Sequence, residues 1–203
     1  MIFFAGTGII SYTMLNKMKK IYINDFLYSN EVIYKAFFGS ANYDEKLILQ
    51  YCEHFRSLSA DELDENYISA NFGVKFFSHT DAKSIGRIRE IIENDKSKMS
   101  EKEFAIILAS LLYSADKSAT TVGHYDAYIK GHDIADTFKF DLIKSYRAKK
   151  SQISISREDS NEFAKKLKCD IVYVDPPYNS RQYSRFYHVL ENITRWQKPH
   201  FKE

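Results

Sequence analysis

The chain has 203 residues, 44% of them hydrophobic and 15% aromatic, so it can bury a substantial core, and its net charge of +2 neither supports nor excludes a nucleic-acid partner. The cysteines, Cys52 and Cys169, are isolated, and no histidine has another four residues away, which favours a reducing compartment and argues against a zinc or histidine metal site. No apolar run approaches the roughly 20 residues of a membrane span, and the N-terminus lacks a signal-peptide pattern, so we expect a cytoplasmic protein without membrane or metal.

The N-terminal stretch predicts a strand, a glycine turn and a helix. Residues 1–4 should end a strand, Gly6 and Gly8 should make the turn, and residues 9–18 should form an amphipathic helix. Glycines let the backbone approach a ligand closely, and a helix N-terminus offers free N–H donors. The pattern is typical of a nucleotide-type site and equally of an ordinary strand–helix turn.

A second strand, residues 21–23, ends at Asn24 and Asp25. An acid at the end of the strand that follows a glycine turn is placed to accept hydrogen bonds from ribose hydroxyls. Alternatively, Asp25 caps the next helix, which should end at Phe38 with Gly39 as its C-cap. The sequence leaves both roles open.

The middle of the chain, residues 40–150, predicts mostly helices. Helical spacing of apolar residues covers 44–58, 81–93 and a run from about 101 to 112. Capping-box patterns open helices at Ser59 and at Ser100. Between 115 and 131, small polar residues, a glycine and two tyrosines predict a surface loop for DNA backbone and base contacts, or else a simple connection.

A short apolar run, residues 171–174, predicts a buried strand, and a similar one is expected near 153–155. Pro176 and Pro177 cannot continue the strand, because proline lacks a backbone N–H, so it should stop at Asp175. In open α/β sheets ligands bind at the carboxyl ends of the strands. The stiff loop offers the Asp175 carboxylate, the Pro176 carbonyl and the ring of Tyr178, or is a structural turn with a core tyrosine.

Three stretches together resemble the Dam-like family of adenine-N6 DNA methyltransferases, in the branch found in restriction–modification systems. They are Phe4-Ala5-Gly6-Thr7-Gly8, then Asn24-Asp25-Phe26 with Tyr28-Ser29, and Asp175-Pro176-Pro177-Tyr178-Asn179 with Arg181-Gln182-Tyr183. The resemblance implies an α/β fold with a Rossmann-like parallel sheet, S-adenosylmethionine as cofactor and double-stranded DNA as substrate. Residues 1–39 and 151–203 would form the cofactor-binding and catalytic domain, and 40–150 a helical insertion with the target-recognition region.

The same resemblance implies roles for individual residues. Phe4, Ala5, Gly6, Thr7 and Gly8 would form the cofactor loop, Asp25 would hold the ribose, and Asp159 would lie near the cofactor adenine. Asp159 and Glu162 fit an ordinary capping box equally well. Asp175, Pro176, Pro177 and Tyr178 would form the catalytic loop, with Tyr178 stacked on a flipped-out adenine. Arg181 and Arg185 are the candidates for DNA phosphate contacts.

The chain departs from the family at both ends. Members carry a segment before the glycine loop and several strands and helices after the catalytic loop, and here both are missing or reduced. We therefore expect a truncated chain, half of a split enzyme completed by a second chain, or the product of a decayed gene. Such a chain should expose apolar surface at strands 1–4 and 171–173.

Two other functions remain open from the sequence. The first is a catalytically inactive DNA-binding or partner-binding module derived from such an enzyme. The second is a methyltransferase that acts on RNA or on a protein glutamine.

Overall fold

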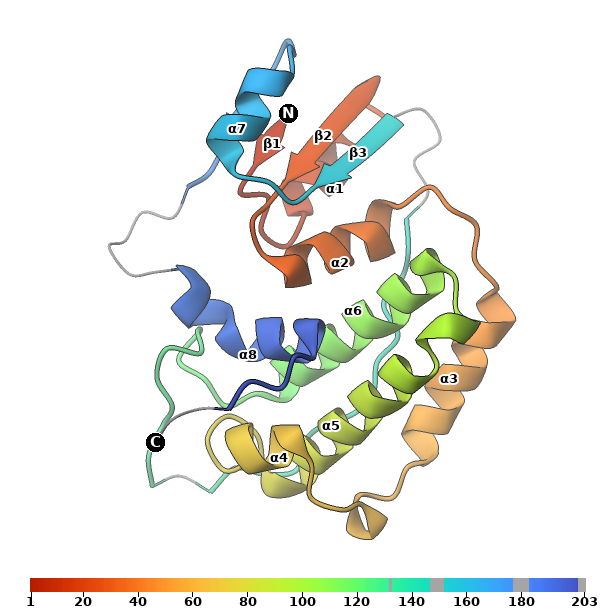
Figure 1. Cartoon of the computed structure of the whole chain (residues 1–203), viewed down its shortest axis with the longest axis vertical. Helices are drawn as coiled ribbons and strands as arrows, with labels where there is room; N and C mark the ends of the chain where they lie inside the picture. Colours follow the sequence, from red (N-terminus) through yellow and green to blue (C-terminus); the bar gives the residue numbers. More distant parts are fainter. Residues whose placement is uncertain (132, 147–151, 177–182, 201–203) are drawn as a thin grey trace.

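The computed structural model describes residues 1–131, 133–146, 152–176 and 183–200. A small parallel sheet with its flanking helices lies at one end of the molecule and a larger helical part at the other (Figure 1).

The sheet has four parallel strands in the order β3-β2-β1-β4. This confirms the expected α/β class. Ile2 pairs with both Ile23 and Tyr173, and the next row continues this register through Val174. Because the strands are parallel and in register, the residues that follow β1, β2 and β4 leave the sheet at one edge. The strand bounds are β1 Ile2–Phe3, β2 Lys20–Asn24, β3 Gln152–Ser156 and β4 Tyr173–Val174.

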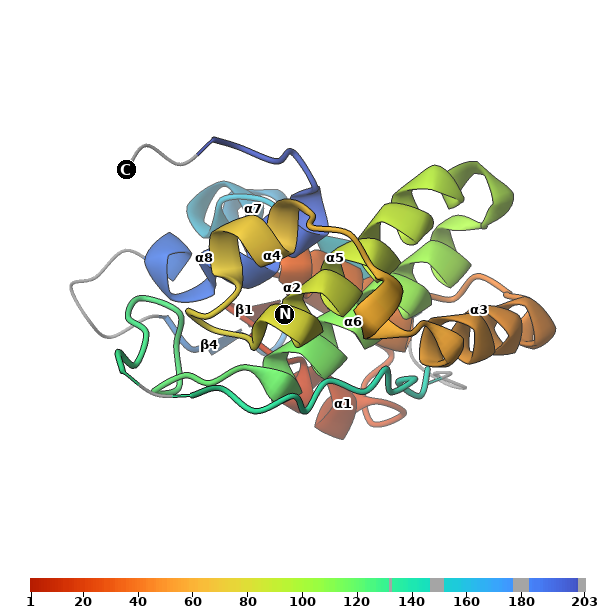
Figure 2. The same ribbon diagram turned by 90° about the horizontal axis from the view of Figure 1, so that it is seen from below.

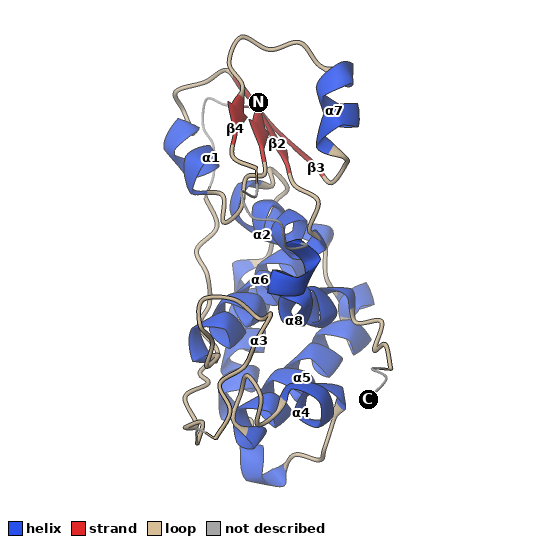
Figure 3. Cartoon of the chain, turned by 90° about the vertical axis from the view of Figure 1, so that its left-hand side faces the viewer, coloured by secondary structure: helices blue, strands red, loops and turns tan. Residues whose placement is uncertain are grey.

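Helices cover the sheet on both faces. α1 (Ile9–Met14) and α7 (Ser160–Lys166) lie on opposite sides of it, and α2 (Tyr28–Phe38) lies between the sheet and the helical part (Figure 3). The small core on the α1 side contains Ile2, Ile21, Ile23, Tyr34 and Phe38. α1 is shorter than expected, ending where Leu15 adopts an extended conformation.

The helical part is built around α6 (Glu101–Ser118), whose residues are almost all buried. This burial explains the continuous apolar run that predicted the helix. Residues 133–146 run as an extended segment along α6 (Figure 2), where Ser114 Oγ accepts from Asp141 N at 2.8 Å. The other elements here are α3 (Glu45–Ser57), α4 (Tyr67–Phe72), α5 (His79–Asn94), α8 (Tyr183–Arg195) and the 3-10 turns Ala60–Glu62 and Lys96–Lys98.

Two side chains of the helical part donate hydrogen bonds to carbonyls near the ends of α2 and α8. Lys102 Nζ donates to the carbonyls of Lys35 and Ala36, at 2.8 Å each, near the end of α2. Arg89, only 1% exposed, donates from Nε to the Ile193 carbonyl at 2.7 Å near the end of α8. The carbonyls of Ala36 and Ile193 lie in the last turn of their helices, where backbone carbonyls lack a partner within the helix. The Lys35 carbonyl also accepts from Gly39 N.

The two predicted capping boxes had different outcomes. The box at Ser100 is confirmed, since Ser100 Oγ accepts from Glu103 N and Glu103 accepts from Ser100 N at 2.7 Å. The box at Ser59 was wrong, because Ser59 makes no side-chain cap bond. The sequence analysis missed α4, whose capping box pairs Asn66 with Ser69 instead of the usual glutamate or glutamine.

A strand is present within the predicted range 171–174, at Tyr173–Val174, but the expectation that these residues are buried was wrong. The four residues are 58%, 51%, 38% and 54% exposed, and among the described residues β4 lies at the edge of the sheet and pairs with β1 alone. The predicted apolar exposure of Ile171 and Tyr173 is thereby confirmed. The same prediction was wrong for Ile2 and Phe3, which are 3% and 5% exposed because β1 lies between two strands.

Candidate functional site at the carboxyl edge of the sheet

The carboxyl edge of the sheet brings together the described parts of the three sequence motifs. Since Phe3 pairs with Asn24 and with Val174, the next residues in each strand, Phe4, Asp25 and Asp175, leave the sheet side by side. Motifs as much as 170 residues apart in the chain therefore share one edge, where ligands bind in open α/β sheets.

The glycine loop is tightly wound. Phe4, Gly6 and Gly8 have φ angles of 53°, 53° and 83°, and the Gly8 N–H donates to the Ala5 carbonyl at 2.9 Å. A Cβ at Gly8 would lie 3.1 Å from Phe38 Cε2, whereas a Cβ at Gly6 would meet nothing within 4 Å. Gly8 therefore allows close helix packing, and Gly6 borders open space that a ligand can occupy.

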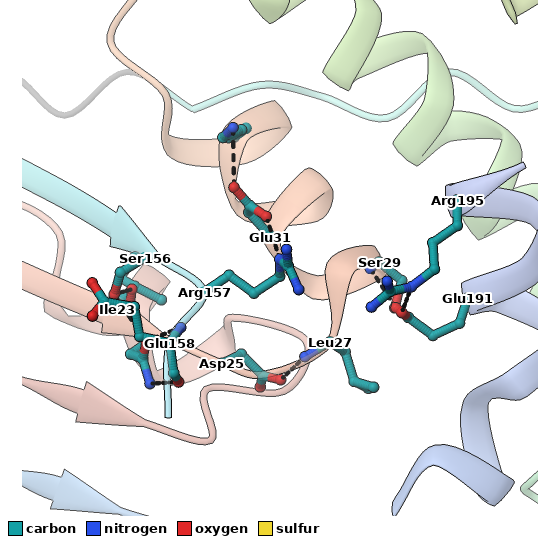
Figure 4. Close-up of polar contacts among 12 residues, drawn as sticks. Ile23, Asp25, Leu27, Ser29, Glu31, Ser156, Arg157, Glu158, Glu191 and Arg195 are labelled. Atoms are coloured by element: carbon teal, nitrogen blue, oxygen red, sulfur yellow. Dashed lines mark hydrogen bonds and ion pairs between the residues drawn. The ribbon is translucent and has the colours of Figure 1, made fainter. Parts of the chain in front are cut away.

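Asp25 is buried behind this loop, with an exposure of 2%. Its Oδ2 accepts from Gly6 N at 3.2 Å and lies 3.2 Å from the Tyr34 hydroxyl, which is itself 2.7 Å from the Gly6 carbonyl. Its Oδ1 accepts from Leu27 N at 3.0 Å (Figure 4). The carboxylate thus ties the glycine loop to the start of α2. The bond from Leu27 N comes close to the predicted capping role, although the N-cap of α2 is Leu27 and not Asp25. The bond to Gly6 was not foreseen, and the ribose contact stays a prediction.

Asn24 and Asp159 shape the turn between β3 and α7. The Asn24 side chain, fully buried, accepts from Glu158 N and donates to Glu158 O, both at 3.1 Å. Asp159 is exposed and accepts from Asn161 N and Glu162 N at 2.9 and 3.1 Å. Asp159 therefore caps α7, as the alternative reading of the sequence held, and its contact with the cofactor adenine stays a prediction.

The structure describes the approach to the catalytic loop. Asp175 and Pro176 are exposed directly after β4. Pro177, Tyr178 and Arg181 lie outside the described residues, so their expected roles stay predictions.

Arg185, the second candidate for phosphate contact, already has a protein partner. Its Nε lies 2.8 Å from Asp126 Oδ1, and the Arg185 side chain is 65% exposed against 8% for Asp126. A DNA contact by Arg185 stays a prediction, and it would have to be made alongside this ion pair.

A cavity of about 670 Å³ borders the glycine loop. Its size suits a cofactor or small ligand. Its walls come from the glycine loop, α1, α2, α6, the loop 121–125, the segment 143–146 and α8. Asp175 does not line it. The residues that line it include Thr7, Gly8, Ser29, Asn30, His124, Phe186 and Tyr187.

Hydrogen bonds fix two walls of this cavity. Tyr125, 3% exposed, donates from its hydroxyl to Asp116 Oδ1 at 2.9 Å, and burial raises the pKa of Tyr125 far above its usual range, so the hydroxyl stays a donor. Glu191 of α8 accepts from Ser29 N at 2.7 Å with one oxygen and from Arg195 Nε at 2.8 Å with the other (Figure 4). α8 is therefore bonded to the first turn of α2.

A metal cluster and a membrane-spanning helix are both absent from the part of the chain that the structure describes. Among the described residues, no three His, Cys, Asp or Glu side chains gather where they could hold a metal ion. In the same part of the chain, no helix is both long and apolar enough to cross a membrane.

Known methyltransferases match nearly the whole chain. The modification methylase StsI of Streptococcus sanguinis is 31% identical over 219 residues, which cover 98% of this chain and 32% of that protein. The type II methyltransferases M.NlaIII of Neisseria lactamica and M.CviAII of Paramecium bursaria Chlorella virus 1 are 29% and 31% identical, over 94% of this chain and 58% and 59% of their own lengths. No solved structure is significantly similar.

The chain thus spans about a third to three fifths of the length of these relatives. Each relative carries the matched stretch and further sequence in one polypeptide, so the comparisons do not support a second chain that supplies missing strands. The model of one protein family, described as D12 class N6 adenine-specific DNA methyltransferase, matches residues 3–203. With this match over nearly all of its length, and with its parallel sheet, the chain belongs to the D12 class of N6 adenine-specific DNA methyltransferases.

Proposed function

We propose that this chain forms the cofactor-binding and catalytic region of a site-specific DNA adenine-N6 methyltransferase of a restriction–modification system. The observation that supports this most is the register of the sheet, which lets the glycine loop, Asp25 and Asp175 leave adjacent strands at one edge. The family match supports the reaction that we assign to this edge, which is methylation of adenine N6.

S-adenosylmethionine is the cofactor that we propose for this edge. The residues present fit it, since Gly6 borders open space and a cavity of about 670 Å³ begins at Thr7 and Gly8. When bound, this cofactor supplies an electrophilic methyl group on a sulfonium. Asp25 would act in two ways, by shaping the loop through Gly6 N and by accepting from the ribose.

Asp175 and Pro176 would activate the adenine amine. An exocyclic amine is a poor nucleophile, because its lone pair is delocalised into the ring. The Asp175 carboxylate and the Pro176 carbonyl would accept its two N–H groups and so favour a localised lone pair. Acceptors held in place before the reaction stabilise the positive charge that develops on nitrogen. Holding the amine in line with the methyl group supplies much of the remaining rate.

The substrate that we propose is double-stranded DNA with the target adenine flipped out. A base inside the duplex cannot reach a loop at a sheet edge, so it must leave the stack, and Tyr178 would stack on it. Arg181 and Arg185 would contact phosphates. The loop between 115 and 131 would contribute to target recognition.

Two measurements test this proposal. Calorimetry with S-adenosylmethionine should show binding, and incubation with duplex DNA and tritiated cofactor should place label in N6-methyladenine after hydrolysis. Binding of cofactor without transfer would contradict the catalytic part of the proposal. Absence of both would favour a module that has lost the enzyme's chemistry.

A further inference from the structure

The loop of residues 121–126 makes three contacts with the beginning of α8. The Tyr125 N–H donates to the Phe186 carbonyl at 3.0 Å. The rings of His124 and Phe186 lie 4.8 Å apart. Asp126 Oδ1 lies 2.8 Å from Arg185 Nε. A backbone bond, a ring contact and an ion pair therefore meet on two successive residues of α8.

The loop is itself firmly anchored to the helical part. Tyr125 is bonded through its hydroxyl to Asp116 of α6, and its ring lies 5.3 Å from that of Phe76. The Asp126 N–H donates to His124 Nδ1 at 3.3 Å, which closes the turn. A contact made by this loop therefore links its partner to α6 and to Phe76 in the packed helical part.

These contacts lie close in the sequence to the segment that is expected to carry catalysis. α8 begins at Tyr183, and Asp175 directly follows β4, so the segment expected to carry catalysis connects β4 to α8 in the sequence. The sheet holds one end, because Tyr173 and Val174 pair with β1. The loop 121–126 holds the other end at Arg185 and Phe186. Fixing both ends of a short segment limits the positions that its functional groups can take.

We infer that Asp126 is a positioning residue for methyl transfer, which holds the catalytic loop in place through Arg185; this inference rests on the proposed function. The Asp126 side chain is 8% exposed, so its charge is poorly solvated and gains more from a guanidinium than a surface carboxylate would. Arg185 is 65% exposed, so the rest of its guanidinium still faces solvent. The largely buried carboxylate of Asp126 thus holds the beginning of α8 in place.

The test compares Asp126→Asn, Arg185→Gln and the double variant with the unaltered full chain. Hydrogen exchange of the backbone amides at 185–188 should quicken roughly tenfold in each variant, because the first turn of α8 opens more easily. The double variant should exchange no faster than the single ones, since both remove the same contact. With tritiated S-adenosylmethionine and duplex DNA, kcat should fall by roughly tenfold in each single variant, and KM for DNA should change little in Asp126→Asn.

Arg87→Gln is the matched control, because Arg87 also lies on a helix and forms an exposed ion pair, 3.7 Å from Glu90. It should change neither the exchange at 185–188 nor kcat. The reversed pair, Asp126→Arg with Arg185→Asp, should recover part of the protection that Asp126→Arg alone loses.

Two results would overturn the inference. One is unchanged exchange at 185–188 in Asp126→Asn, which decides the matter even if the chain transfers no methyl group and the proposed function fails. The other is faster exchange with an unaltered kcat. A loss of DNA affinity and a shallower salt dependence in Arg185→Gln alone, with Asp126→Asn unaffected, would instead assign Arg185 to a phosphate.

Discussion

Gly6 and Gly8 share a left-handed backbone but have different surroundings. A side chain at either position is strained, at a cost of about 1 kcal/mol. At Gly8 the new Cβ also lies 3.1 Å from the Phe38 ring, whereas at Gly6 it points into open space. We therefore expect Gly8→Ala to lower the free energy of unfolding more than Gly6→Ala does, as measured by urea denaturation.

We expect Gly6→Ala to lose more cofactor affinity than Gly8→Ala, although Gly8→Ala loses more stability. Gly6→Ala places a methyl group in the space that we assign to S-adenosylmethionine, so its affinity should fall by more than its modest loss of stability suggests. Calorimetry on both variants makes the comparison. A Gly6→Ala chain that binds the cofactor as tightly as the unaltered chain would show that the ligand does not approach this loop.

Asp159 offers a direct choice between its two predicted roles. As the cap of α7, it accepts from Asn161 N and Glu162 N, so Asp159→Ala should lower the free energy of unfolding by about 0.5–2 kcal/mol. Asp159→Ser, which can still cap, should recover most of that loss. If capping is its main task, both variants keep the cofactor affinity of the unaltered chain. A large loss of affinity in Asp159→Ser would give the residue to the cofactor site.

At the level of single residues, the sequence predicted Asp25 and Asp175 at the carboxyl edge but missed the side chains that shape it. Asp25 is hydrogen-bonded to Gly6, 19 residues away in the sequence, and Asn24 to Glu158, 134 residues away. Strand patterns place a residue at an edge, because a strand must end where prolines or turn residues begin. They do not predict which side chain from another element will bond to it.

Helix caps connect neighbouring elements, and Glu103 is the clearest case. It accepts from Ser100 N within its own capping box and from Asp44 N at the start of α3, at 2.7 Å each. Burial acts to raise the pKa of Glu103, but the N–H donors of Asp44 and Ser100 outweigh it, and the pKa is lowered from its usual 4.5. The ionised form is therefore favoured by folding.

The sign of the pH effect follows from this direction. A carboxyl group whose pKa is lower in the folded state adds stability above its unfolded value, and that stability is lost as the pH falls through the folded value. At pH 7, Glu103→Gln should lower the free energy of unfolding by about 1 kcal/mol. The difference from the unaltered chain should shrink as the pH is lowered below about 4.5.

Glu62→Gln is the matched control for this variant. Glu62 stands three residues after Ser59, as Glu103 stands after Ser100, yet Ser59 forms no cap bond. Urea denaturation of the Glu62→Gln chain should match the unaltered chain at every pH. A Glu103→Gln effect that grows as the pH falls would contradict the assignment of the charged form to the cap.

For whole elements, apolar spacing predicted the long helices well, since α5 and α6 bury continuous stripes. It was less successful for short elements. β4 looks apolar enough to be buried, but its place at the edge of the sheet depends on pairing with β1 across the whole chain. α4 has only six residues, and its Asn66 cap pairs with a serine.

Across the whole molecule, two helices join the sheet to the helical part. α2 packs between the sheet and the helical part. The carbonyls of Lys35 and Ala36, near its end, accept hydrogen bonds from Lys102 of α6. α8 bonds to the start of α2 through Glu191 and to α5 through Arg89. The elements that flank the proposed cofactor loop and catalytic loop are thus parts of one packed unit. None of these contacts could be predicted from the sequence, because each joins distant residues.

The central claim is that Asp175 at the edge of this sheet activates an adenine amine. Asp175→Asn keeps the size of the side chain and one acceptor but removes the charge that stabilises the developing positive nitrogen. Losing one such preorganised partner costs on the order of 10²–10³ in rate. Asp170→Asn, on the exposed stretch that precedes β4, is the matched control.

The decisive measurement is tritiated methyl transfer from S-adenosylmethionine to duplex DNA, together with cofactor affinity by calorimetry. Asp175→Asn should lose turnover by about 10²–10³ while binding the cofactor nearly as well as the unaltered chain, and Asp170→Asn should keep full turnover. Undiminished transfer by Asp175→Asn would contradict the claim.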